Sequence, residues 1–106
     1  MSIKDQIDTF SNTKVLVIGD IMLDTYIHGT VHRMSPEAPV PVVSEERRNF
    51  CLGGAANVAL NLKSLGADTH IISVIGKDDK GNQIKTLLAD ANINAELIED
   101  LKRPTT

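Results

Sequence analysis

The chain has 106 residues, 42% of them hydrophobic and only 3% aromatic, so it forms one domain at most, with an aliphatic core. With 11 basic and 14 acidic residues, its net charge of −3 disfavours nucleic acid as a partner, because phosphate binding needs a basic surface. A single cysteine excludes an internal disulfide. No apolar run approaches the roughly 20 residues of a membrane span, and the first residues lack the apolar stretch of a signal peptide. We therefore expect a cytoplasmic protein with no membrane partner.

The first residues predict a short helix followed by a strand. Ile3, Ile7 and Phe10 recur at helical spacing. Residues 15–18 then form a continuous apolar run that ends at Gly19. Such a run predicts a buried strand of a parallel sheet.

The segment between Tyr26 and Phe50 has a different character. It is rich in valine, which favours strands. Three prolines interrupt it: Pro36, Pro39 and Pro41. Because proline cannot donate to a central ladder, we expect edge strands or a projecting β-flap over residues 26–50.

Strands and helices alternate in the second half of the chain. The predicted elements are a helix at 55–65, a strand at 71–75, a helix capped by Asp78 or Asp79, and a strand at 93–98. One apolar stripe, of Val58, Leu62 and Leu65, marks the first helix, and another, of Ile84, Leu87, Leu88 and Ala91, marks the second. Gly66 stands where a helix end favours a left-handed residue. The alternation predicts an α/β fold with a parallel sheet flanked by helices.

Two carboxylates follow the first strand, where open α/β sheets bind their ligands. Asp20 and Asp24 could accept hydrogen bonds from sugar hydroxyls, and a carboxylate can bind two adjacent hydroxyls at once. From spacing alone, a turn or helix cap is an equal alternative for Asp24. A dinucleotide site is disfavoured, because the turn has one glycine, Gly19, and lacks the Gly-x-Gly-x-x-Gly pattern.

A glycine pair precedes the first helix of the second half. Gly53 and Gly54 would let a ligand approach the backbone closely, and free N–H groups at the helix start can donate to it. Asn57, within the first turn, offers both a donor and acceptors. The alternative is a tight loop with a packed helix start and a solvated Asn57.

The stretch from Gly53 through Asn57 to Gly66 and Gly76 is similar over its whole length to the first signature of the PfkB, or ribokinase-like, sugar kinases. The element from Gly19 to Asp24 resembles the sugar-binding first strand of the same family. The resemblance implies a ribokinase-like fold with a projecting β-lid.

Two further segments resemble the heptose 7-phosphate kinase branch of this family, whose bifunctional members also carry an ADP-heptose synthase domain. These segments are residues 34–42 and residues 103–106. The resemblance covers nearly all of the chain from Lys14 onward.

The resemblance also implies roles for individual residues. The aspartate that matches Asp24 holds sugar hydroxyls in the family, and the residues that match Gly53, Gly54 and Asn57 line the same pocket. Asp20 is a further candidate, although many relatives differ there. The segment that matches residues 26–50 is a lid over the sugar and often a dimer contact, so we expect a homodimer through this lid.

Basic side chains are candidates for binding the phosphate of a sugar phosphate, because guanidinium groups bind phosphate in a bidentate manner. Arg33 and Arg103 are favoured because they adjoin the segments typical of the branch, while Arg47 and Arg48 are further candidates. Each could instead be an ordinary surface charge. The three histidines are scattered and predict no metal site.

The resemblance implies that residues 1–106 are the N-terminal, sugar-binding part of a kinase. The whole protein would use ATP and Mg²⁺ to phosphorylate the anomeric hydroxyl of D-glycero-D-manno-heptose 7-phosphate, a step toward lipopolysaccharide. A kinase of another sugar and a non-catalytic sugar-binding or dimerisation module are the alternatives. The family's Gly-Ala-Gly-Asp motif, which holds the general base, and its nucleotide-binding segments do not occur in these residues. We therefore assign no catalytic residue and expect these residues alone to be inactive.

Overall fold

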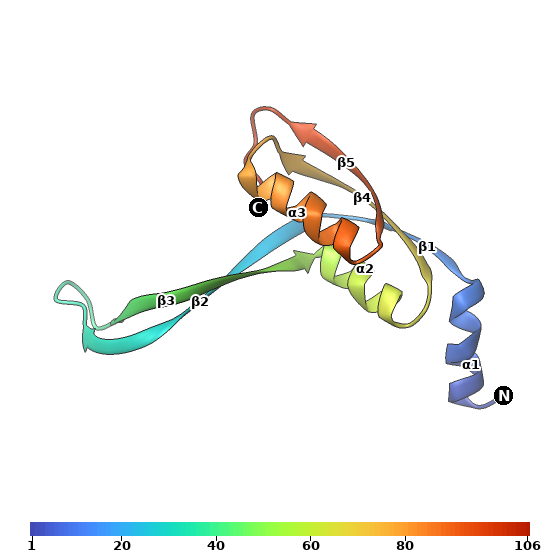
Figure 1. Cartoon of the computed structure of the whole chain (residues 1–106), viewed down its shortest axis with the longest axis horizontal. Coiled ribbons are helices and arrows are strands. Elements are labelled where there is room, and N and C mark those ends of the chain that lie inside the picture. The colour runs from blue at the N-terminus through green and yellow to red at the C-terminus, as the bar shows by residue number, and fades with distance from the viewer.

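A computed structural model describes the backbone of all 106 residues and every side chain except that of His32. In chain order the elements are α1 (Ile3–Asp8), a 3-10 helix η1 (Thr9–Asn12), β1 (Lys14–Ile18), β2 (Ile21–Met34), β3 (Pro41–Gly54), α2 (Ala55–Ser64), β4 (Asp68–Gly76), α3 (Asp79–Asp90) and β5 (Asn94–Asp100). They form a three-stranded sheet with helices beside it, and a long hairpin that projects from it (Figure 1).

The three-stranded sheet has the order β1-β4-β5, and both of its strand pairs are parallel. Helix α3 connects β4 to β5, and α2 leads from the hairpin into β4. Asp78 caps α3, and Gly66 has a positive φ of 99° after α2, as the sequence predicts. The predicted α/β fold with a parallel sheet is therefore confirmed.

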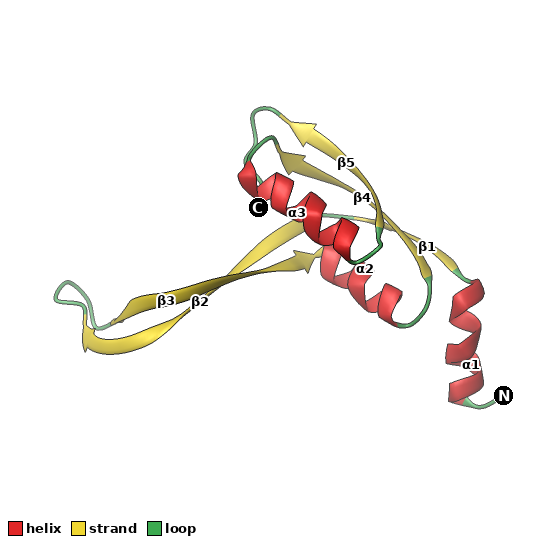
Figure 2. Ribbon diagram, viewed as in Figure 1, coloured by secondary structure: helices red, strands yellow, loops and turns green.

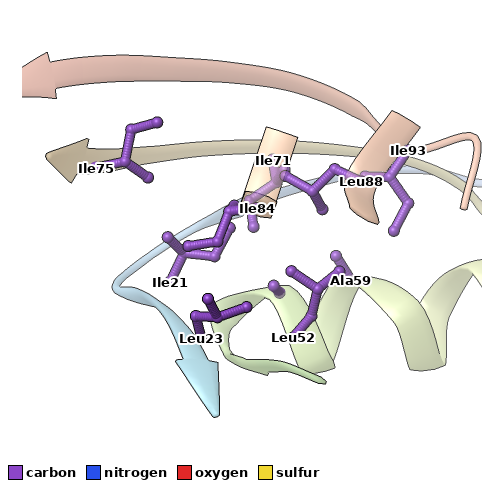
Figure 3. Close-up of a cluster of buried hydrophobic side chains, with 10 residues drawn as sticks. Ile21, Leu23, Leu52, Ala59, Ile71, Ile75, Ile84, Leu88 and Ile93 are labelled. Carbon is purple, nitrogen blue, oxygen red and sulfur yellow. The ribbon is translucent and has the colours of Figure 1, made fainter. Parts of the chain in front are cut away.

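The hydrophobic core lies between one face of the sheet, the helices α2 and α3, and the root of the hairpin (Figure 3). Its buried members are Ile21, Leu23, Leu52, Ala56, Ala59, Ile71, Ile75, Ile84, Leu88 and Ile93. Because β2 contributes Ile21 and Leu23 and β3 contributes Leu52, the hairpin root belongs to the core. The root is thus packed into the same core as the sheet.

The prediction that residues 15–18 form a buried strand is wrong for one face of β1. Leu16 is 54% exposed and Ile18 is 72% exposed, whereas Val15 and Val17 are half-buried toward the helices. The cause is that α2 and α3 both pack on the same face of the sheet (Figure 2). An apolar run indicates that both faces of a strand are apolar, but it does not indicate whether other elements cover both faces.

Helix α2 packs through its smallest residues. Ala56 and Ala59 are fully buried against the sheet and the hairpin root, whereas Val58 and Leu65 of the predicted stripe are about half exposed. Small side chains allow the helix backbone to approach β4 closely. On α3, by contrast, the predicted stripe does face the core, with Ile84 and Leu88 buried.

The flap is a regular antiparallel hairpin that exceeds the expected bounds at both ends. Strands β2 and β3 pair from Ile21 opposite Gly54 to Met34 opposite Pro41, with two irregularities in register. The prolines at the turn and at the first position of β3 leave the ladder intact, as expected. At the first irregularity a Cβ on Gly29 would lie 1.9 Å from the carbonyl oxygen of Ser44, so glycine is required there.

The N-terminal helix α1 lies outside the core. Ser2 caps it, since its hydroxyl accepts a hydrogen bond from the amide of Asp5 at 3.1 Å, and none of its residues is buried. Within the described residues, every helix is too short or too polar to cross a bilayer.

Replacement of a core side chain on α3 should be far more harmful than replacement of its exposed neighbour. Ile84 has no exposed surface, so Ile84→Ala should lower the free energy of unfolding by about 2–5 kcal/mol. Asn82 is exposed on the same helix, so Asn82→Ala should change it by about 0.5 kcal/mol or less. Urea denaturation of the whole protein measures both, and equal effects would show that Ile84 is not in the core.

Candidate functional site

The candidate residues meet where the chain leaves the sheet for the hairpin and returns to start α2. Asp20 lies between β1 and β2, and Ala55 is the first residue of α2. The backbone amide of Ala55 donates to the carbonyl oxygen of Asp20 at 2.8 Å. This bond closes the hairpin root onto the carboxyl end of β1, which is where open α/β sheets bind ligands.

Gly54 makes this closure possible. It has a φ of 59° and a ψ of −133°, a backbone conformation that side chains other than glycine rarely adopt. A Cβ at this position would also lie 2.4 Å from the carbonyl oxygen of Asp20. The lack of a side chain at Gly54 therefore allows the backbone to cross Asp20 at this point.

Gly53 has a different role, which concerns Asp24. In the ladder Asp24 pairs with Cys51, and Gly53 pairs with Met22 on the same face of the hairpin. A Cβ on Gly53 would lie 2.4 Å from Asp24 Oδ2. The carboxylate of Asp24 therefore occupies the space that a side chain at position 53 would take.

Among the side chains that the structure describes, none occupies the carboxylate of Asp24, which is therefore available as a hydrogen-bond acceptor. Asp24 is exposed, and among those side chains none forms a hydrogen bond or ion pair with it. Asp24 lies inside β2, so it caps neither a helix nor a turn. This removes the alternative that its spacing had left open.

Asn57 lies in the first turn of α2 and is exposed. The N-cap residue of this helix is Gly54, which provides no side-chain hydrogen bond to the first amides. The start of α2 thus presents backbone donors beside the amide group of Asn57. Groups of these kinds, and the carboxylate of Asp24 on β2, suit a ligand with several hydroxyls.

Ser73 holds the crossing in place and was missed by reasoning from sequence. Its side chain is buried in β4, with 5% of the residue exposed. The hydroxyl donates to the carbonyl oxygen of Gly19 at 2.7 Å and accepts from the amide of Ile21 at 3.1 Å. It therefore fixes the backbone on both sides of Asp20. The available signal was a single hydroxyl within the otherwise apolar strand 71–75.

The two faces of the hairpin differ in their balance of polar and apolar side chains. On the face of Asp24, the side chains of His28 and Asn49 approach each other, with Nε2 and Nδ2 3.3 Å apart. The opposite face, called the apolar face below, carries Leu23 and Leu52 in the core and the half-exposed Ile27, Val31 and Val43 farther out. It also carries the exposed ion pair between Arg48 and Glu45. A ligand at Asp24 would thus meet the face opposite the apolar face.

The two favoured arginines lie in different places. Arg33 pairs with Val42 near the hairpin tip, nine residues beyond Asp24, which is about 30 Å at a rise of ~3.3 Å per residue. Arg103 follows β5, and its carbonyl oxygen would lie 2.6 Å from a Cβ on Gly76 at the end of β4. Within one chain, only Arg103 lies at the carboxyl edge of the sheet with Asp20.

A hollow of about 440 Å³ lies elsewhere, on the open face of the sheet. Lys14, Leu16, His70, Ile72 and Glu96 are among its lining residues. These side chains belong to the face that neither α2 nor α3 covers, at the opposite end of the strands from Asp24. The hollow reflects an uncovered sheet face, because parallel sheets are normally covered on both sides. Among the side chains that the structure describes, no cluster could hold a metal ion.

Comparison with known proteins identifies relatives of this chain. Residues 12–106 match the family described as "pfkB family carbohydrate kinase". The chain is 48% identical over 99 residues to the D-beta-D-heptose 7-phosphate kinase of Bordetella bronchiseptica, which covers 93% of this chain and 32% of that protein. It is 54% identical over 84 residues to the bifunctional protein HldE of Hydrogenovibrio crunogenus, covering 79% of this chain and 18% of that protein.

Solved structures agree with the fold. A carbohydrate kinase from Agrobacterium tumefaciens matches with a TM-score of 0.68 and 26% identity, over 88% of this chain and 29% of that one. A nucleoside kinase from Methanocaldococcus jannaschii, a member of the ribokinase family, matches with a TM-score of 0.65 and 24% identity, over 87% of this chain and 30% of that one. The ribokinase-like fold that the sequence predicts is therefore confirmed. The chain spans 18% and 32% of the two curated relatives described above.

The two left-handed glycines provide a test of the hairpin root. Gly54→Ala should lower the free energy of unfolding of the whole protein by about 2–5 kcal/mol, because strain adds to a steric overlap with Asp20. Gly66→Ala should lower it by only about 1–2 kcal/mol, because its Cβ would meet nothing closer than 3.9 Å. Thermal or urea unfolding compares the two variants. If Gly66→Ala proves the more harmful, Gly54 does not close the root.

Proposed function

We propose that the whole protein phosphorylates a sugar and that residues 1–106 hold the sugar. The premise is that this chain belongs to the pfkB family of carbohydrate kinases. The observation that carries the proposal is the carboxylate of Asp24, which lies exposed over Gly53 at the hairpin root. Gly53 directly precedes Gly54, the N-cap residue of α2, and the first turn of that helix contains Asn57. This arrangement supports binding of a polyhydroxyl ligand.

We further propose that the sugar is D-glycero-D-manno-heptose 7-phosphate, phosphorylated at its anomeric hydroxyl. Support comes from the relatives, whose names include D-beta-D-heptose 7-phosphate kinase, at 48% identity over 93% of this chain. The identity to HldE of Hydrogenovibrio crunogenus, 54%, supports the same branch. The alternative is a kinase of another sugar, and activity measured with a panel of sugars would distinguish the two.

Each residue has a definite task in this proposal. Asp24 accepts hydrogen bonds from sugar hydroxyls, and Asn57 both donates and accepts. Gly53 leaves room for the carboxylate of Asp24, and Gly54 starts α2 so that its first amides face the pocket. Arg103, at the same edge of the sheet, is the candidate for the sugar phosphate. Arg33 could serve such a pocket only from a second copy of the chain.

The phosphoryl donor in this proposal is ATP with Mg²⁺, which neutralises charge on the transferred group. No residue of these 106 is assigned to the nucleotide, the metal ion or the general base. The contribution of this part is therefore to bind the sugar and orient its hydroxyl, which lowers the barrier by positioning.

The apolar face of the hairpin supports a homodimer through this lid. Ile27, Val31 and Val43 are about half exposed, and Val31 and Val43 pair directly across the two strands. A two-stranded hairpin has no second layer of its own to cover such a face. A second copy related by a two-fold axis would cover both faces at once.

Loss of the sugar-binding groups should impair use of the sugar selectively. In the whole protein, Asp24→Asn and Asn57→Ala should each lower kcat/KM for heptose 7-phosphate by roughly 10- to 100-fold, because each removes a hydrogen bond to a hydroxyl. The KM for ATP should change little. Asp90→Asn, at the exposed end of α3, is the matched control and should behave as wild type. Steady-state kinetics with the sugar and with ATP measures these effects. If both variants kept the wild-type kcat/KM for heptose 7-phosphate, the site assignment would be wrong.

Charge on the apolar face of the hairpin should disrupt the dimer. Val43 and Ser44 are neighbours on β3, and their side chains point to opposite faces. Val43→Lys should therefore yield monomers at micromolar concentration, whereas Ser44→Lys should remain dimeric. Sedimentation equilibrium of the whole protein measures both. A monomeric wild type, or dissociation by both variants alike, would contradict a dimer through this face.

A further inference from the structure

The segment after β5 is bound to the turn between β4 and α3 by a single carboxylate. Asp78 Oδ1 accepts from the hydroxyl of Thr105 at 2.6 Å, and Asp78 Oδ2 accepts from the amide of Thr105 at 2.8 Å. The Thr105 hydroxyl oxygen in turn accepts from the amide of Gly76 at 2.9 Å. Thr105 is only 8% exposed, unlike the residues that flank it.

The same carboxylate caps α3, because Oδ1 also accepts from the amide of Gly81 at 2.8 Å. Three donors therefore converge on Asp78. The pKa of Asp78 is held below its usual value, chiefly by the hydroxyl of Thr105 and then by the amides of Thr105 and Gly81. These donors therefore favour the charged form of the carboxylate.

Two glycines leave room for Thr105. A Cβ on Gly76 would lie 2.7 Å from the amide nitrogen of Thr105, and a Cβ on Gly81 would lie 3.1 Å from its hydroxyl oxygen. A Cβ on Gly81 would also lie 2.4 Å from the carbonyl oxygen of Gly76. The turn is therefore shaped around this threonine as well as bonded to it.

The next residue reaches the hairpin root. The carbonyl oxygen of Thr106 accepts from the amide of Leu23 at 2.8 Å, and Leu23 is a buried core residue directly before Asp24. The edge of β2 that faces away from β3 is therefore held by this segment. The start of β2 is held separately, where Ser73 bonds to the amide of Ile21.

We propose that Asp78 and Thr105 form a latch that positions the hairpin root at Leu23 and Asp24. The two are positioning residues, since neither is placed in contact with the ligand. The latch transmits the position of the β4–α3 turn to β2 through one peptide unit, from Thr105 to Thr106. Its effect on sugar use rests on the proposed function, whereas its effect on the Leu23 amide does not.

Three variants of the whole protein isolate the latch. Thr105→Val keeps the shape of the side chain but removes its hydroxyl, and Thr105→Ser keeps the hydroxyl. Asp78→Asn retains the cap of α3, because asparagine caps helices as well as aspartate, but turns one acceptor into a donor that faces the amide of Thr105. Thr86→Val, on the exposed side of α3, is the matched control for hydroxyl loss.

The first readout is hydrogen exchange of the Leu23 amide, which needs no activity. Thr105→Val and Asp78→Asn should each speed this exchange about tenfold, because the hydrogen bonds that hold Thr106 against β2 are weakened. Thr105→Ser and Thr86→Val should leave it unchanged. Unchanged exchange in Thr105→Val would overturn the latch.

The second readout is steady-state kinetics. Thr105→Val should raise the KM for the sugar about tenfold while the KM for ATP stays constant, and Thr105→Ser should restore both. Faster exchange at Leu23 with an unchanged KM for the sugar would overturn the positioning of Asp24. A wild-type protein that phosphorylates no sugar would refute the proposed function, and the exchange of Leu23 would then decide the latch alone.

Discussion

The hydrogen bond from the amide of Ala55 to the carbonyl oxygen of Asp20 is the constraint on which the site depends. It closes a hairpin of two 14-residue strands at its root and joins the end of β1 to the start of α2. Gly54 permits the bond through its positive φ, and Ser73 fixes the backbone on either side of Asp20. The ladder of β2 and β3 brings Asp24 near the start of α2, and this closure joins both to the end of β1.

The closure also explains why the chain combines a firm root with an extended lid. Ile21 and Leu23 anchor the start of β2 in the core, whereas the outer hairpin residues are largely exposed. The site lies between the buried hairpin root and the exposed outer part of the hairpin. A carboxylate at this position has a rigid backbone beneath it and an accessible surface above it, which is the arrangement that positioning of a substrate requires.

Local patterns in the sequence predicted much of the fold. Apolar runs located the strands, Asp78 and Gly66 marked helix ends, and the prolines marked the flap. These signals succeed because they depend on neighbours in the chain. The position of Asn57 in the first turn after the glycine pair made it a candidate, and the family resemblance implied its role.

Contacts between distant residues were beyond prediction. Ser73 bonds to a residue 54 positions away, and Thr105 bonds to one 27 positions away. The space that Gly53 leaves for Asp24 depends on the register of the hairpin, which the sequence does not specify. The exposure of Ile18 was likewise unpredictable, because an apolar run does not reveal which of its faces is covered.

The most direct test of the account is a crystal structure of the whole protein with heptose 7-phosphate bound. The account predicts sugar hydroxyls within about 2.6–3.2 Å of the carboxylate of Asp24, with Asn57 contacting the same sugar. A sugar bound away from the hairpin root, with the carboxylate of Asp24 facing only solvent, would contradict it.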